Sequence, residues 1–143
     1  MDEVFLYNHG GSANHGCEAI VRTSKKIIDT DITLMSMNPQ GDKRYGVDEI
    51  INVERDNTSC EYGKLSGLLA GVYCKLKRSD YMFNKLKRND LISKAKKGDI
   101  FVSIGGDNYC YGGYDILADV NTALKKKGVK TVFYWQYIVV KKI

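Results

Sequence analysis

Short apolar runs alternate along the chain with amphipathic segments. Val4–Tyr7, Ile32–Met37 and Asp99–Ile104 are rich in apolar and β-branched side chains, which favours strands. Cys17–Ile28 has the spacing of an amphipathic helix, and the polar run Asp29–Asp31 ends it. The chain therefore begins as strand, glycine-rich loop, helix and strand, which is the pattern of a parallel βαβ unit.

The remaining segments continue this alternation. Asp99–Ile104 is almost continuously apolar, so we predict a central strand that is covered on both faces. Before it, we predict a turn at Asn38–Asp42, a strand at Ile50–Val53 and a loosely packed helix at Gly63–Leu76. One or two basic helices follow within Lys75–Lys97 and end at Gly98. After it, we predict a helix at Tyr114–Lys127 capped by Gly128 and a strand from Lys130 to Trp135. This order predicts an α/β fold: one domain over residues 1–143, with a Rossmann-like, mainly parallel sheet and helices on both faces.

Positive charge is concentrated in one part of the chain. The net charge is +5, and the segment Lys75–Lys97 alone carries an excess of +7. Such a segment could bind nucleic acid, anionic lipid or an acidic sugar polymer, or it could be a solvated helix face. We do not expect nucleic acid, because only Tyr81 and Phe83 supply aromatic rings among these charges.

The four cysteines are widely separated and form no CxxC pair, so we predict neither a metal site nor a disulfide framework. The chain begins Met1-Asp2-Glu3, with two acidic residues where a secretory leader would be basic. We therefore expect reduced thiols and a cytoplasmic location.

Two glycine-rich turns are the chain's main candidates for a functional site. His9–Gly16 and Ile104–Asn108 each follow a predicted strand and precede a predicted helix, the position where open α/β sheets bind ligands. Gly11 and Gly16 have the spacing of a phosphate-binding P-loop, but Cys17-Glu18 replaces its Lys-Ser/Thr pair. The dinucleotide-binding GxGxxG spacing is also absent, so we exclude both kinds of nucleotide loop.

The polar side chains of these turns suit hydrogen bonding to sugar hydroxyls. In the first turn they are Asn14, His15 and Glu18, and His15 could also act as an acid or a base. His15 could equally be a structural histidine, and Glu18 could simply satisfy the helix N-terminus. Asp107 and Asn108 follow the second turn as binding residues or as helix caps. We interpret His9 as structural.

With these residues the chain resembles the N-terminal half of the polysaccharide pyruvyl transferase family. Three segments carry the resemblance. Asn14–Ile20 resembles the family's first loop and helix, Gly98–Asp107 its strand and Gly-Gly loop, and Lys126–Phe133 the helix-to-strand step that follows. Their order and spacing agree across nearly the whole chain.

The resemblance implies both a fold and an activity. Members resemble B-type glycosyltransferases, in which two Rossmann-like halves face each other across a cleft. They transfer pyruvate from phosphoenolpyruvate to a sugar, without a cofactor, in the synthesis of surface polysaccharides. By resemblance this chain supplies the acceptor-side wall, formed by Asn14, His15, Gly16, Gly105, Gly106 and Asp107. The implied partners are a sugar or polysaccharide precursor and, at the membrane, a sugar-lipid.

The chain departs from the family after the strand Val132–Trp135, where members continue into a second domain and Gln136–Ile143 stands here instead. We expect an incomplete domain that is inactive alone and whose exposed sheet edge a second copy could cover. Two alternatives stay open: a nucleotide-sugar glycosyltransferase domain, which shares the architecture, and a non-catalytic module that binds polyanions through the Lys75–Lys97 face.

Overall fold

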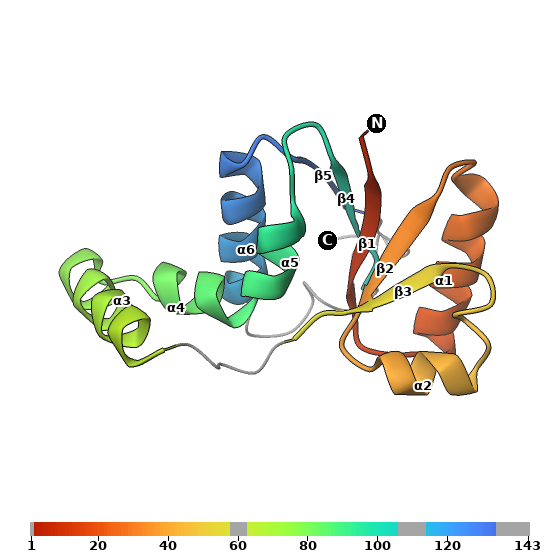
Figure 1. Ribbon diagram of the computed structural model, residues 1–143, viewed down its shortest axis with the longest axis horizontal. Coiled ribbons are helices and arrows are strands. Elements are labelled where there is room, and N and C mark those ends of the chain that lie inside the picture. Colours follow the sequence, from red (N-terminus) through yellow and green to blue (C-terminus); the bar gives the residue numbers. More distant parts are fainter. Residues whose placement is uncertain (1, 58–62, 106–113, 134–143) are drawn as a thin grey trace, which may run out of the picture.

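A parallel five-stranded sheet forms the centre of the protein (Figure 1). The computed structural model describes residues 2–57, 63–105 and 114–133. The strand order is β3-β2-β1-β4-β5, and every pair of neighbours is parallel. The strands are β1 (Val4–His9), β2 (Ile32–Ser36), β3 (Asn52–Arg55), β4 (Ile100–Ser103) and β5 (Lys130–Phe133). The prediction of a Rossmann-like α/β fold is confirmed.

Helices cover both faces of this sheet. They are α1 (His15–Ile27), α2 (Pro39–Arg44), α3 (Lys64–Lys77), α4 (Tyr81–Lys87), α5 (Asn89–Lys94) and α6 (Tyr114–Lys126). In Figure 1, α1 lies on one face and α4, α5 and α6 lie on the other, whereas α3 projects outward beyond α4. Within the described ranges, no helix combines the length and the apolar character needed to cross a membrane.

Each face of the sheet has its own hydrophobic core. Phe5 and Tyr7 of β1 pack with Phe101 of β4 beneath α5 and α6, and the rings of Phe5 and Phe101 stack at 4.6 Å. The alternate residues Leu6 and Val102 enter the second core, which lies beneath α1. Burial on both faces explains why these strands are continuously apolar and not alternating. The central strand is β1, and β4 is interior, with a neighbour on each side.

The predicted turn at Asn38–Asp42 is wrong, because this segment forms the start of α2. Asn38 is the N-cap, and its side chain accepts a hydrogen bond from the Gly41 amide at 3.1 Å. Pro39 occupies the first helical position, where its missing N–H costs nothing and its fixed φ is favourable. The residues that mark a turn here serve instead as the start signal of a short helix.

Two boundaries also differ from the predictions. The third strand lies at Asn52–Arg55, two residues later than predicted. Gly98 does not cap the basic helix, since α5 ends at Lys94; instead Gly98 adopts φ +101° in the connection to β4, and its amide bonds to the Gly128 carbonyl. Gly128 follows α6 with φ +81°, as predicted for a C-terminal cap.

Candidate functional site

The two glycine-rich turns leave from neighbouring strands at the same edge of the sheet. β1 and β4 are paired in parallel, with Tyr7 opposite Ser103, so their carboxyl ends lie side by side. The chain order of the strands reverses between them, because β1 continues through α1 to β2 on one side, whereas β4 continues through α6 to β5 on the other. This is the topological switch point at which open α/β sheets bind ligands.

The first turn is held by the N-cap of α1. Asn14 accepts a hydrogen bond from the Gly16 amide at 2.9 Å. A side chain at position 16 would crowd this cap, because a Cβ there would lie 3.1 Å from Asn14 Oδ1. Both residues are nevertheless exposed. Asn14 and Gly16 therefore have a structural role that leaves them at the surface of the switch point.

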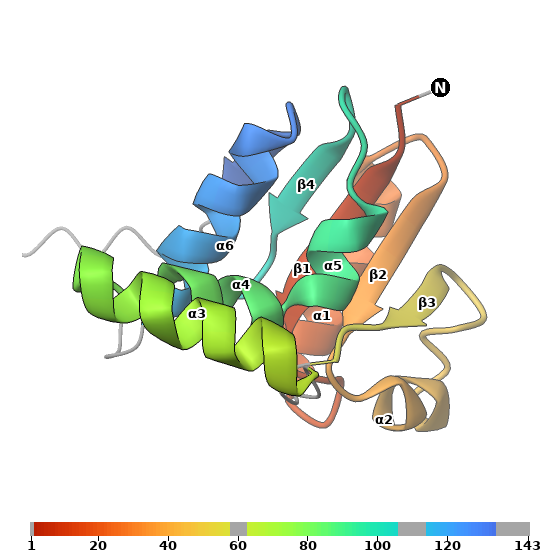
Figure 2. The same cartoon turned by 60° about the vertical axis from the view of Figure 1, so that its left-hand side comes forward.

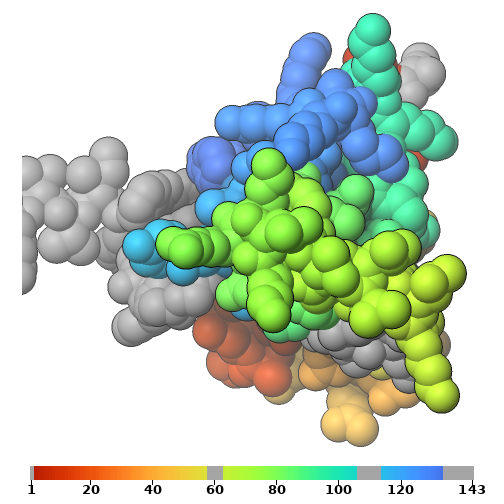
Figure 3. Space-filling view, turned by 90° about the vertical axis from the view of Figure 1, so that its left-hand side faces the viewer, coloured from red at the N-terminus to blue at the C-terminus, as the bar shows by residue number. Residues whose placement is uncertain are grey.

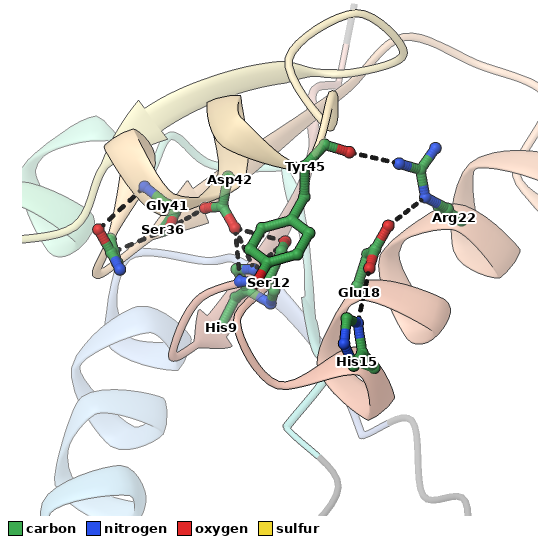
Figure 4. A network of polar contacts seen from close by, with 10 residues as sticks. His9, Ser12, His15, Glu18, Arg22, Ser36, Gly41, Asp42 and Tyr45 are labelled. Carbon is green, nitrogen blue, oxygen red and sulfur yellow. Dashed lines mark hydrogen bonds and ion pairs between the residues drawn. The ribbon is translucent and has the colours of Figure 1, made fainter.

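His15, at the start of α1, begins a chain of polar contacts that runs to α2 (Figure 4). Its Nδ1 lies 3.3 Å from Glu18 Oε2, and Glu18 Oε1 accepts a hydrogen bond from Arg22 Nε at 2.8 Å. Arg22 also donates to the Tyr45 carbonyl at 2.6 Å. The hydrogen bond from Arg22, followed by that from His15, lowers the pKa of Glu18. Glu18 is therefore a carboxylate at neutral pH and can accept a hydrogen bond from His15 Nδ1 when this nitrogen carries a proton.

The same edge also contains a buried carboxylate, Asp42 of α2 (Figure 4). Its Oδ1 accepts hydrogen bonds from the Ser12 amide at 2.8 Å and from the Ser12 hydroxyl at 2.5 Å, and lies 2.9 Å from His9 Nε2. Its Oδ2 accepts from the Ser36 hydroxyl. Burial opposes ionisation, but the hydrogen bonds from Ser12, Ser36 and His9 outweigh it and lower the pKa of Asp42.

These residues include a serine, a histidine and an aspartate, but they do not form a nucleophilic triad. In a triad the histidine bonds the serine through one ring nitrogen and the carboxylate through the other. Here Nε2 of His9 faces both Asp42, at 2.9 Å, and Ser12 Oγ, at 3.5 Å, while the Ser12 hydroxyl donates directly to Asp42. This cluster of Asp42, His9, Ser12 and Ser36 thus fixes the first glycine turn to β1, β2 and α2. The arrangement agrees with a structural role for His9.

A second buried network joins the ends of β1, β3 and β4. Arg88, between α4 and α5, forms an ion pair with Asp56 through Nε and Nη2, and Nη2 also donates to Asn8 Oδ1 at 3.0 Å. Asn8 Nδ2 in turn donates to Ser103 Oγ at 2.9 Å. All four side chains are buried. Burial raises the pKa of Asp56, although the Arg88 guanidinium opposes this rise.

Asn8 adopts an unusual backbone conformation within this network. Its φ is +64°, which lies in the left-handed region that residues other than glycine rarely adopt. The register of β1 against β2 also shifts at this point. The hydrogen bonds to Arg88 and Ser103 hold this conformation. Strained residues and strand irregularities of this kind concentrate at binding sites.

Gly10 and Gly11 differ in why they are glycine. Gly11 has φ +121°, and a Cβ there would lie 3.1 Å from the Asn38 Cβ, so the fold itself requires glycine. A Cβ at Gly10 would meet none of the described residues within 4 Å, and no positive φ constrains this exposed residue. Among the residues that the structure describes, there is therefore open space over the backbone of Gly10, at the end of β1.

The structure brings together the site residues predicted from the first turn. Asn14, His15, Gly16 and Glu18 lie at the start of α1, and Gly105 lies just beyond the neighbouring strand β4. The other three predicted binding residues, Gly106, Asp107 and Asn108, lie outside the described residues. Within the described ranges, no group of three or more potential metal ligands occurs.

Three cations of the predicted basic segment Lys75–Lys97 are paired with acidic side chains. Arg88 is buried in the ion pair with Asp56, and Lys94 and Lys96 pair with Glu54 and Glu3. The rest of this positive charge is distributed over α3, α4 and the residues that follow them. Binding of a polyanion by this segment stays a prediction.

Sequence reasoning missed the buried polar residues of both networks. The sequence predicts a turn at Asp42, and it predicts Arg88 in a basic segment that either binds an anionic partner or forms a solvated helix face. Asp56 directly follows the third strand and Ser103 ends β4, so their positions at carboxyl strand ends were the one available signal.

Two hollows lie near the sheet edges. One, of about 380 Å³, is lined by Met37, Asn38, Pro39, Gln40 and Arg55 at the carboxyl ends of β2 and β3. A second, of about 510 Å³, lies at the opposite edge, where β1, β2 and β3 begin. The first hollow adjoins the candidate site through Asn38, whereas the second is remote from both glycine turns.

Comparisons with known proteins add no assignment. No family model, no curated protein and no solved structure matches the chain.

Proposed function

We propose that this chain is a Rossmann-like half of a polysaccharide pyruvyl transferase and that its carboxyl edge binds the acceptor sugar. The observation that carries the proposal is the adjacency of the two motif-bearing turns, one at the end of β1 and one at the end of β4. The two turns that resemble the family are far apart in the sequence, yet they start side by side at the switch point. Open backbone at Gly10 and the exposed side chains of Asn14 and His15 suit sugar hydroxyls.

In this proposal His15 is the acid–base residue. The Glu18 carboxylate accepts a hydrogen bond from Nδ1–H, which leaves the Nε2 lone pair for a proton. Nε2 takes the proton of a sugar hydroxyl as its oxygen bonds to C2 of phosphoenolpyruvate, while C3 gains a proton from an acid. The oxygen of a second hydroxyl then bonds to C2 as the bond from C2 to the phosphate oxygen breaks, and that hydroxyl's proton leaves with the phosphate, giving a ketal and inorganic phosphate. The cationic pocket for phosphoenolpyruvate belongs, by resemblance, to the other half of the enzyme.

Binding is the appropriate test, because half of a cleft orients its substrates poorly for turnover. Amide resonances of the ¹⁵N-labelled chain would be followed during separate titrations with galactose, N-acetylglucosamine, mannose, phosphoenolpyruvate and uridine diphosphate. We expect at least one sugar to shift the resonances of Gly10, Asn14, Gly16 and Gly105. Shifts with uridine diphosphate in place of sugars would favour the nucleotide-sugar glycosyltransferase, and an unperturbed carboxyl edge with every probe would refute both readings.

Two substitutions sharpen this test. His15→Gln keeps a polar side chain without a titratable ring, so sugar binding should persist while acid–base chemistry in any completed enzyme is lost. Gly10→Leu should fill the open space at the end of β1 and abolish the shifts. Lys25→Gln, on the same helix but near its far end, is the matched control and should bind like the unmodified chain.

A further inference from the structure

The outward face of α3 is apolar, which is unusual for an exposed helix. Leu65, Leu68, Leu69, Val72 and Leu76 have exposed fractions between 52% and 77%. In an α-helix, with about 100° per residue, these five side chains fall within an arc of roughly 100° and form a continuous stripe. We refer to these five residues as the α3 stripe.

The side of α3 opposite the stripe is the one that packs on the protein. Ala70 and Cys74 are buried there, and a Cβ at Gly71 would lie 3.9 Å from Phe83 Cζ of α4. Figure 2 shows α3 lying across the outside of α4, and in Figure 3 the side chains of α3 stand foremost on that face of the molecule. The small residues thus attach the helix, and the large apolar residues point away from the protein.

The charges around the stripe are positive. Lys64 and Lys75 border one side of it, Tyr73 borders the other with Lys77 beyond it, and α3 contains no acidic residue. Arg78 follows at the end of the helix and is exposed. Farther along the same layer, a hollow of about 330 Å³ between α4, α5 and α6 is lined by Lys85, Lys126 and Lys127 and by no carboxylate.

We propose that α3 is an interfacial helix that docks the protein on a bilayer containing anionic lipid. An amphipathic helix with leucines on one face and lysines along its borders lies in the headgroup region, with the leucines reaching the acyl chains and the ammonium groups contacting lipid phosphates. A second copy of the chain fits less well, because two stripes packed together would bring lysines near lysines with no carboxylate on either helix to pair them.

This inference does not depend on the proposed sugar site, since it uses other residues on another side of the molecule. The test is co-sedimentation of the full chain with vesicles of phosphatidylcholine alone, and with vesicles of phosphatidylcholine and phosphatidylglycerol in equal amounts. We expect binding to the mixed vesicles that weakens as salt is added. Absence of binding to the mixed vesicles, or equal binding to both kinds, would overturn the proposal.

Two pairs of variants separate the apolar from the electrostatic contribution. Leu68→Ser with Leu69→Ser should weaken binding by about tenfold or more, because two side chains no longer enter the acyl region. Lys75→Gln with Lys77→Gln should weaken binding by about fivefold for each lysine. The matched controls are Ile27→Ser, an exposed apolar residue on α1, and Lys43→Gln with Arg44→Gln on α2; both should bind like the unmodified chain.

Measurements without lipid test the two other possible covers of the α3 stripe, which are a second copy of the chain and another part of the same chain. The leucine variant should keep the unfolding temperature of the parent, since the stripe makes no internal core, and the parent should sediment as a monomer. A dimer that the leucine variant dissociates would make a second copy the occupant of the stripe. A fall of several degrees in the unfolding temperature would show that the chain itself covers the stripe. Either result would overturn the lipid proposal.

Discussion

The carboxyl edge of the sheet buries charged side chains, whereas helix α3 exposes apolar ones. At the edge, Asp42, Asp56 and Arg88 are buried, and each is paired with other side chains. On α3, leucines are exposed and the described structure covers them with nothing. Burying a charge is costly unless it is paired, and exposing a large apolar surface is costly unless something else covers it. The buried charges of the edge are therefore paired within the described structure, whereas the leucines of α3 have no cover within it.

The largest effect should come from breaking the buried ion pair. Arg88→Met leaves the Asp56 carboxylate buried without its cation, and we expect a loss of about 3–5 kcal/mol in the free energy of unfolding. Urea denaturation followed by circular dichroism measures this loss. Lys87→Met, at the adjacent half-buried position, should cost far less. Similar losses for the two variants would mean that the Asp56–Arg88 pair has no special part in holding the strand ends.

Removing the charge of Asp42 should have the next largest effect. Asp42→Asn replaces the shared carboxylate of four hydrogen-bonding contacts, and we expect a loss of about 1–3 kcal/mol near neutral pH.

The loss should also depend on pH in a defined direction. Since the folded-state pKa of Asp42 is lowered, its ionisation stabilises the fold above the unfolded pKa of about 3.9. That stabilisation disappears as the pH falls from there through the lower folded-state pKa. The difference between parent and Asp42→Asn should thus be constant near neutrality and shrink in acid; a difference that grows in acid would contradict the lowered pKa.

The two adjacent glycines provide a smaller, paired comparison. Gly11→Ala forces a side chain into φ +121° and against Asn38, so we expect a loss of about 1–3 kcal/mol. Gly10→Ala meets open space and should change stability by no more than about 0.5 kcal/mol. Thermal unfolding of both variants checks the pair. Equal losses of stability in the two variants would mean that the fold also requires glycine at position 10, and that the space at the end of β1 is not open.

The smallest effect is expected at the exposed part of the carboxyl edge. His15 is 80% exposed and its contact with Glu18 is solvated, so His15→Gln should alter stability by less than about 0.5 kcal/mol. Chemical denaturation near neutral pH measures this. A larger loss would make His15 a structural residue, which is the alternative that its sequence position left open.

The sequence predicted the framework well and the networks poorly. Local periodicity predicts strands β1, β2 and β4 and helices α1 and α6, and Gly128 marks the end of α6. α2 was missed because Asn38, Pro39 and Gly41 are equally typical of a turn, and only the packing of Asp42 against β1 and β2 selects the helix. Within the candidate site, Asn14 to Glu18 could be predicted to lie together because they are close in sequence along one turn and helix.

By itself, the sequence determined the alternation of strands and helices, since apolar periodicity is a local property that each segment carries alone. The tertiary structure alone decided which distant polar groups meet, such as Asp42 with His9 across 33 positions and Arg88 with Asn8 across 80. It also decided that the apolar stripe of α3 faces outward. A helical period specifies that a stripe exists, but the same period fits a stripe turned toward the core or away from it.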